Sequence, residues 1–165
     1  MGGMSALAFC TLSPKASDSL VTISSAARSE PFSIAVRSLQ REIIMSDRDW
    51  KKGQYDPESP PEIGMRLARK LGMISYRSAQ EWRDRFSRER VVNQPAEATP
   101  FGIDFEIESY LDAHARKFTG RFDPNCYVYL SRAMDLYDLG EHSGCIATEL
   151  SRASMRRALV IGVES

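Results

Sequence analysis

The first four residues, Met1-Gly2-Gly3-Met4, have the types and spacing of a turn that presents a nucleophile. In many enzymes with a nucleophilic serine, that serine stands in a Gly-x-Ser-x-Gly turn between a strand and a helix, where glycines permit a strained backbone and close packing. Met1 to Met4 fit the second half of such a turn, with the serine expected immediately before Met1. A glycine pair at a helix start also serves close packing alone, so both interpretations stay open.

A nucleophilic serine needs a histidine as base and a carboxylate that orients it. Glu164 follows the last apolar run and could be that acid. It comes a little early, and a flanking structural carboxylate fits equally well. His114 and His142 stand in no motif of a catalytic histidine, so we expect them on the surface or near helix ends.

The sequence has three cysteines, Cys10, Cys126 and Cys145. They are an odd number, far apart, with no Cys-x-x-Cys pair, which argues against a disulfide framework and favours a reducing compartment. The cysteines and the two histidines lack the spacing of metal ligands. We therefore expect no metal and no bound cofactor.

Composition excludes several classes of partner. The chain has 165 residues, 42% of them apolar, and 22 basic residues balance 22 acidic ones. With no basic excess, nucleic acid and anionic membrane surfaces are not expected partners. No apolar stretch reaches the length of a membrane span and no signal peptide is visible. We expect a cytoplasmic protein, or a mitochondrial one if a targeting peptide precedes Met1.

Two short apolar runs predict strands, at residues 20–24 and 158–163. Both are rich in β-branched residues and do not alternate with polar residues, which is typical of parallel strands buried on both faces. Apolar periodicity predicts helices over the segments 2–12, 31–44, 62–90, 104–119, 124–138 and 144–153. The fifth of these opens with Asp123 as N-cap and Pro124 at the first helical position.

More than a hundred mostly helical residues separate the two strands, far more than a crossover needs. We interpret them as an inserted lid. The predicted fold class is α/β, a partial α/β-hydrolase fold with a mostly helical lid between two parallel strands. The predicted domains are 1–30 (nucleophile helix and first strand), 31–154 (lid) and 155–165 (strand leading to the catalytic acid).

Several ordered segments resemble the homoserine O-acetyltransferase family, which includes serine O-acyltransferases. MGGM resembles the end of the family's Gly-Gly-Ser-Met-Gly-Gly-Met elbow, and ALVIGVES resembles the strand before its catalytic Asp. IIMSDRDWKKGQY and GMRLARKLGMISYRS resemble two segments of its lid. FEIESYLDAHARKFTGRFDPNCYVYLSRAMDLYD is the most specific match, although AHAR replaces a segment that often contains Gln-Gly.

The resemblance implies where the catalytic residues lie. The serine is expected just before Met1, the Asp just after Ser165 and the His further downstream, so the chain carries none of the triad. We interpret it as an internal fragment that is inactive alone. In this fold the backbone N–H after the serine, here that of Met1, belongs to the oxyanion hole.

The resemblance also implies substrate-binding roles for Arg69 and Tyr76. A guanidinium binds the carboxylate of an amino acid through two parallel hydrogen bonds. Seven residues are two helical turns, so both side chains are expected on one face of their helix. On spacing alone, a surface arginine and a core tyrosine explain the pair as well.

The function implied for the full-length protein is acetyl-CoA-dependent O-acetylation of L-homoserine, in methionine biosynthesis. Acetyl-CoA is a co-substrate, and a homodimer through lid helices is the expected assembly. Serine O-acetyl- or O-succinyltransfer, in cysteine biosynthesis, is the close alternative. A plain hydrolase of the same fold and a non-catalytic dimerisation module remain further alternatives, and we expect the chain expressed alone to be poorly soluble, because its strands would have open edges.

Overall fold

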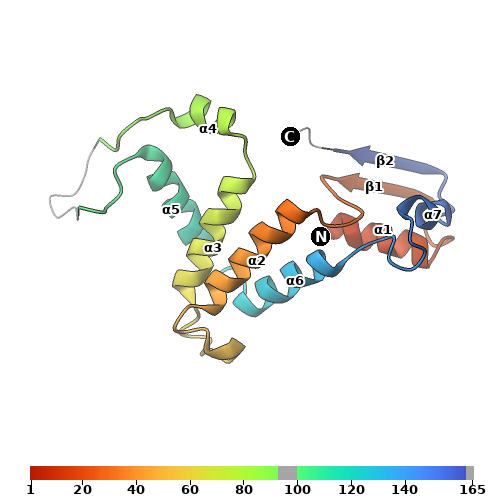
Figure 1. The fold of residues 1–165 in the computed structure, drawn as a ribbon, viewed down its shortest axis with the longest axis horizontal. Coiled ribbons are helices and arrows are strands. Elements are labelled where there is room, and N and C mark those ends of the chain that lie inside the picture. Colours follow the sequence, from red (N-terminus) through yellow and green to blue (C-terminus); the bar gives the residue numbers. More distant parts are fainter. Residues whose placement is uncertain (93–99, 163–165) are drawn as a thin grey trace. The chain divides into compact units, whose positions relative to one another are not determined.

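The structure is a computed structural model that describes residues 1–92 and 100–162. In chain order its elements are α1 (Gly2–Leu12), β1 (Ser19–Ile23), α2 (Pro31–Met45), the 3-10 helix η1 (Lys51–Gly53), α3 (Glu62–Ser75), α4 (Ala79–Phe86), α5 (Glu106–Phe118), α6 (Pro124–Leu136), α7 (Ile146–Ser151) and β2 (Arg157–Ile161) (Figure 1). Within the described ranges, no helix is both long and apolar enough to cross a membrane.

The chain divides into two compact units, residues 1–35 with 129–165, and residues 36–128. We call them the sheet unit and the helical unit. The division falls inside α2 and inside α6, so each of these helices belongs partly to both units. The domain limits expected from the sequence, at 30/31 and 154/155, stay a prediction.

The sheet unit contains β1 and β2, which pair in parallel from Ser19 with Arg157 to Ile23 with Ile161 (Figure 1). The pairing continues one residue further, where the Ser24 N–H donates to the Ile161 carbonyl oxygen at 2.8 Å. The predicted parallel pair is therefore confirmed, although the two strands lie more than a hundred residues apart in the sequence.

The prediction that these strands are buried on both faces is wrong for the described residues. In β1, burial alternates, with Leu20 and Thr22 buried and Val21 and Ile23 exposed. All five residues of β2 are exposed. Within this unit α1 lies against β1, and the alternating burial of β1 places one of its faces against other residues.

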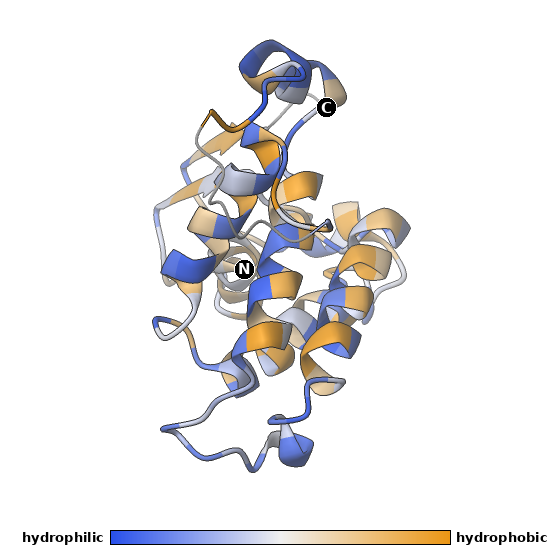
Figure 2. Cartoon of the chain, turned by 90° about the vertical axis from the view of Figure 1, so that its left-hand side faces the viewer, coloured by the Kyte–Doolittle hydropathy of each residue, from blue (hydrophilic) through white to orange (hydrophobic). Residues whose placement is uncertain are grey.

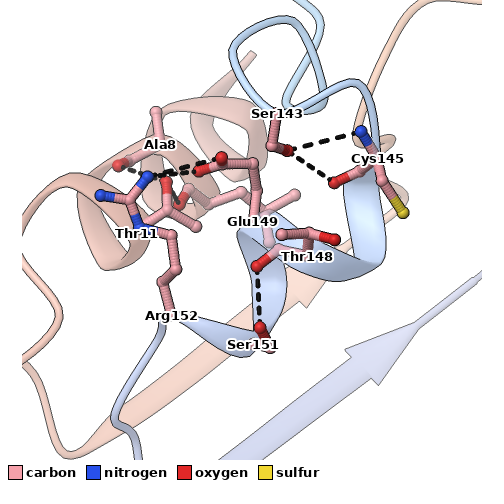
Figure 3. A network of polar contacts seen from close by, with 9 residues as sticks. Ala8, Thr11, Ser143, Cys145, Thr148, Glu149, Ser151 and Arg152 are labelled. Carbon is pink, nitrogen blue, oxygen red and sulfur yellow. Dashed lines mark hydrogen bonds and ion pairs between the residues drawn. The ribbon is translucent and has the colours of Figure 1, made fainter.

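Helix α7 lies beside α1 in the sheet unit, and a polar group stands at their contact (Figure 3). The buried Glu149 carboxylate of α7 pairs with the Arg152 guanidinium at 3.2 Å. The buried Thr11 hydroxyl of α1 donates to the carbonyl oxygens of Leu7 and Ala8 at 3.3 and 3.1 Å. These polar side chains are satisfied locally, as burial requires.

The helical unit is built around the contact of α3 with α5. Ile44, Met65 and Ala68 form its buried core. Its helices carry both apolar and polar residues (Figure 2), as expected of helices with one buried side.

An ion-pair network spans α3 and α5. The Asp112 carboxylate lies 2.7 Å from the Lys70 ammonium and 2.6 Å from the Arg116 guanidinium. The hydrogen bond from Lys70, followed in size by the one from Arg116, lowers the pKa of Asp112 from 3.8 to about 2. The network therefore ties α3 to α5 with a carboxylate that stays ionised in mild acid.

Two segments that carry the family resemblance, SDRDWKKGQY and RFDPNCY, meet in the helical unit. The Tyr55 hydroxyl donates to the Asp123 carboxylate at 2.6 Å, and the Asn125 amide donates to the Gly53 carbonyl oxygen at 2.9 Å. Asp123 also accepts from the Cys126 N–H at 2.8 Å, which confirms it as the N-cap of α6. These segments therefore fix how α6 begins relative to η1.

The single helical stretch predicted over residues 62–90 is two helices. Tyr76 closes α3, and Ser78 begins α4 by accepting from the Glu81 N–H at 3.1 Å. A Ser followed three residues later by Glu is the sequence pattern of a capping box. The sequence around Ser78 therefore indicates the break between the two helices, although the apolar periodicity continues across it.

Candidate functional site

Met1 lies at the N-terminus of α1, half exposed, and its carbonyl oxygen accepts from the Ser5 N–H at 3.1 Å. A Cβ on Gly2 would meet none of the described residues within 4 Å, but a Cβ on Gly3 would collide with the Ser25 side chain. Ser25 follows β1, so Gly3 allows α1 to pack closely against the strand's end. A nucleophile turn and a plain packing contact both need this close approach.

A cavity of about 170 Å³ adjoins Met1 within the sheet unit. Met4, Ser5 and Ala8 of α1 line it together with Ala133, Met134 and Tyr137. Its lining is almost entirely apolar, and burial raises the pKa of Tyr137. The cavity thus places apolar space directly beside the residue assigned to the oxyanion hole.

Strand β2 ends at Ile161, and Glu164, the residue considered as a catalytic acid, lies outside the described residues.

Arg69 lies on α3 in the helical unit. Its guanidinium carbon stands 4.7 Å from the centre of the Phe118 ring, a cation–π contact that holds the side chain in place. The Nε atom is buried and has no hydrogen-bond partner among the described residues. A buried charged donor without an acceptor is costly, so Arg69 is suited to receive an anionic group of a ligand.

Tyr76 ends α3, seven residues after Arg69, and its side chain is 70% exposed. Its hydroxyl would lie 3.7 Å from a Cβ placed on Gly72. Arg69 and Tyr76 both act electrostatically on a third residue, Tyr127 of α6. The helical unit therefore places the two predicted binding residues near one common neighbour.

Tyr127 and Gln40 are polar neighbours of this site that the sequence did not indicate. Burial raises the pKa of Tyr127 to about 12, the Tyr76 phenol adds to the rise, and Arg69, Arg37 and Gln40 oppose it. Tyr127 also packs on the core of the helical unit. In the sequence, Gln40 could have been found as a polar residue within the apolar stripe of its helix.

The histidines and cysteines lie elsewhere. The His114 ring packs on Tyr110 at 4.0 Å between ring centres, and His142 is exposed. Cys10 is buried, whereas Cys126 and Cys145 are exposed. In the part of the chain that the structure describes, no three His, Cys, Asp or Glu side chains gather into a possible metal site.

Comparison with known proteins relates the whole chain to acyltransferases. No protein-family model matches it. A serine O-succinyltransferase from Xylella fastidiosa (strain M23) is 53% identical over 163 residues, which are 98% of this chain and 44% of that protein. Another from Stenotrophomonas maltophilia is 51% identical over 166 residues, 100% of this chain and 45% of that protein. The chain thus spans less than half the length of these curated relatives.

Solved structures give the fold. A homoserine O-acetyltransferase from Bacillus anthracis superposes with a TM-score of 0.83 at 20% identity, covering 98% of this chain and 42% of that one. The esterase E22 superposes with a TM-score of 0.78 at 21% identity, covering 98% and 44%. Both have the α/β-hydrolase fold, so the predicted partial α/β-hydrolase fold is confirmed. A transferase and an esterase share this likeness, so it does not distinguish the two chemistries.

Proposed function

We propose, from the premise that this chain belongs to the homoserine O-acetyltransferase family, that the product of its complete reading frame transfers a succinyl group from succinyl-CoA to the side-chain hydroxyl of L-serine. The observation that carries the proposal is the 53% identity to a serine O-succinyltransferase over 98% of the chain. Acetyl transfer to L-homoserine, expected first from the sequence motifs, is the alternative.

The proposed reaction exchanges a thioester for an ester. A serine preceding Met1 attacks the thioester carbonyl, the C–S bond breaks and CoA leaves as a thiol. The hydroxyl of the amino acid then attacks the acyl-enzyme, a C–O bond forms and the enzyme serine is restored. A histidine moves the proton in each step, and an Asp orients the histidine. No metal or bound cofactor takes part.

The residues of this chain bind and orient the reactants. The peptide N–H of Met1 donates to the oxyanion of the tetrahedral intermediate. The guanidinium of Arg69, held over Phe118, binds the acceptor's carboxylate, and Tyr76 also binds the acceptor. The helical lid excludes water, because water would hydrolyse the acyl-enzyme.

The proposed assembly is a homodimer formed by lid helices. Ile63, Leu67 and Ile74 are 61%, 45% and 50% exposed. Their spacing of four and seven residues puts them on one face of α3. An exposed apolar stripe of this kind is suited to pack against the same stripe of a second copy.

The test is acyl transfer by the product of the complete reading frame, with serine or homoserine as acceptor and succinyl-CoA or acetyl-CoA as donor. We expect the highest kcat/KM for serine with succinyl-CoA, by about tenfold or more. Preference for homoserine with acetyl-CoA would establish the alternative. Release of free acid without transfer to any acceptor would identify a hydrolase and refute both.

Arg69→Lys tests the assigned carboxylate site. The charge remains but the two-pronged donor is lost, so the KM for the amino acid should rise while that for acyl-CoA stays within about twofold. Arg83→Ala, at an exposed position on α4, is the control and should change neither. Equal changes in both KM values would show that Arg69 does not bind the acceptor specifically.

A further inference from the structure

The Phe118 ring contacts both Arg69 and Tyr127. The Arg69 guanidinium lies over this ring, and the Tyr127 ring stands edge-on to it, with ring centres 6.2 Å apart at 80°. Phe122 packs on both aromatic rings, stacked on Phe118 and at 89° to Tyr127. Aromatic packing therefore fixes the tyrosine beside the arginine that we assign to the acceptor's carboxylate.

Gln40 is a neighbour of both Tyr127 and Gly72. The Gln40 side chain is buried, and its Nε2 donates to the Ala68 carbonyl oxygen at 2.9 Å. A carbonyl can accept only from the amide's NH₂ group, so this bond fixes the orientation of the amide. Gln40 also stands close enough to the Tyr127 phenol to oppose the rise in its pKa. One buried amide therefore bonds to the backbone of α3 and lies near the phenol on α6.

Gly72 leaves the space in which this arrangement fits. A Cβ at this position would lie 2.5 Å from the Gln40 Nε2 and 3.7 Å from the Tyr76 hydroxyl oxygen. Any larger residue would push the glutamine amide away, because 2.5 Å is well inside van der Waals contact. The missing side chain thus lets Gln40 and Tyr76 approach the same point of α3.

We propose that Tyr127 is a further acceptor-binding residue, whose hydroxyl donates to the carboxylate held by Arg69, and that Gln40 is the positioning residue behind it. The inference rests on the proposed function, because it takes a hydroxy amino acid as the ligand. It adds a contact from α6, so the acceptor would be held by two helices rather than by α3 alone.

The chemistry of the groups fits a carboxylate. Its two oxygens offer about four lone-pair sites, more than one guanidinium fork occupies. A phenol whose pKa is about 12 keeps its proton at neutral pH and remains a donor. The buried Nε of Arg69 adds a donor that has no acceptor among the described residues. A carboxylate satisfies both donors at once.

The test uses Tyr127→Phe in the product of the complete reading frame, with Tyr129→Phe as the matched control. Both changes remove one hydroxyl, two residues apart on α6, but Tyr129 is 74% exposed. For Tyr127→Phe we expect the KM for the amino acid to rise about tenfold, as for a lost hydrogen bond to a charged group. The KM for acyl-CoA and the melting temperature should stay near the wild-type values, and the control should resemble the wild type throughout.

Gln40→Ala tests the positioning role. This variant should also raise the KM for the amino acid. In the double variant with Tyr127→Phe, the rise in KM should be smaller than the product of the two single rises, because both changes act on one contact. Fully multiplicative effects would show that Gln40 does not act through Tyr127 and would overturn its role.

The remaining outcomes are distinct. An unchanged acceptor KM in Tyr127→Phe, with an active wild type, would overturn this inference and leave the proposed function standing. A joint change of both KM values with a lowered melting temperature would show a purely structural tyrosine and would overturn it as well. A wild-type product that acylates no hydroxy amino acid would overturn both.

Discussion

The ion-pair network of Asp112 makes a quantitative prediction about stability. Replacing Asp112 by Asn keeps the size of the side chain but removes the charge that Lys70 and Arg116 contact at 2.7 and 2.6 Å. The pKa of Asp112 falls from 3.8 to about 2 on folding. At 1.36 kcal/mol per pKa unit this corresponds to about 2.4 kcal/mol. Solvent screening reduces it, because Arg116 is 62% exposed, so we expect a loss of about 1–2 kcal/mol at pH 7.

The pH dependence follows from the sign of the shift. Because folding lowers the pKa of this carboxyl, its contribution is present above the ordinary value of 3.8 and is lost as the pH falls through about 2. The wild type should therefore exceed Asp112→Asn in free energy of unfolding by nearly the same amount at pH 7 and pH 5. The difference should shrink below about pH 4 and be largely lost at about pH 2.

Urea denaturation of the chain measures this difference, at low protein concentration because we expect the isolated chain to be poorly soluble. Both tryptophans, Trp50 and Trp82, lie in the helical unit, so their fluorescence follows the unit that contains Asp112. Asp18→Asn is the control, because the Asp18–Arg156 pair is 79% and 84% exposed. It should change the free energy of unfolding by less than about 0.5 kcal/mol. A difference for Asp112→Asn that is equally small, or that persists unchanged at pH 2.5, would refute the argument.

Three further predictions concern the helical unit. Tyr55→Phe removes the hydroxyl that donates to Asp123 at 2.6 Å, so the pKa of Asp123 should rise toward its ordinary value in an NMR titration; an unchanged pKa would contradict the assigned bond. Gly72→Ala would ordinarily stabilise a helix by about 1 kcal/mol, but displacing Gln40 should reverse the sign to a loss of about 1–3 kcal/mol in urea denaturation. A gain would show that the amide moves freely. Leu67→Glu should turn the proposed homodimer into a monomer in light scattering, and an unchanged mass would exclude this face of α3.

The fold was predictable where local signals determine it. The β-branched runs predicted two parallel strands, and Asp123-Pro124 predicted the start of α6. Strand burial was not predictable, because it depends on which elements cover the sheet, and β2 is exposed along its length.

The candidate site was predictable only in part. Spacing and family resemblance selected Arg69 and Tyr76, but their neighbours come from other helices. Gln40 lies on α2 and Tyr127 on α6, and only tertiary packing brings them to Gly72 and Phe118. A periodic pattern assigns such residues to a buried face, without saying which polar group they meet there.

The parallel pairing of β1 with β2 affects the order in which the chain folds during synthesis. During synthesis β1 leaves the ribosome more than a hundred residues before its partner. At about 5–20 residues per second, the strand waits on the order of ten seconds with its hydrogen-bonding edge open. Local helices form in microseconds, so those of the helical unit have time to fold during this wait. Among the described residues the sheet is therefore the last part to close, and until then the unpaired edge of β1 can pair with a wrong strand.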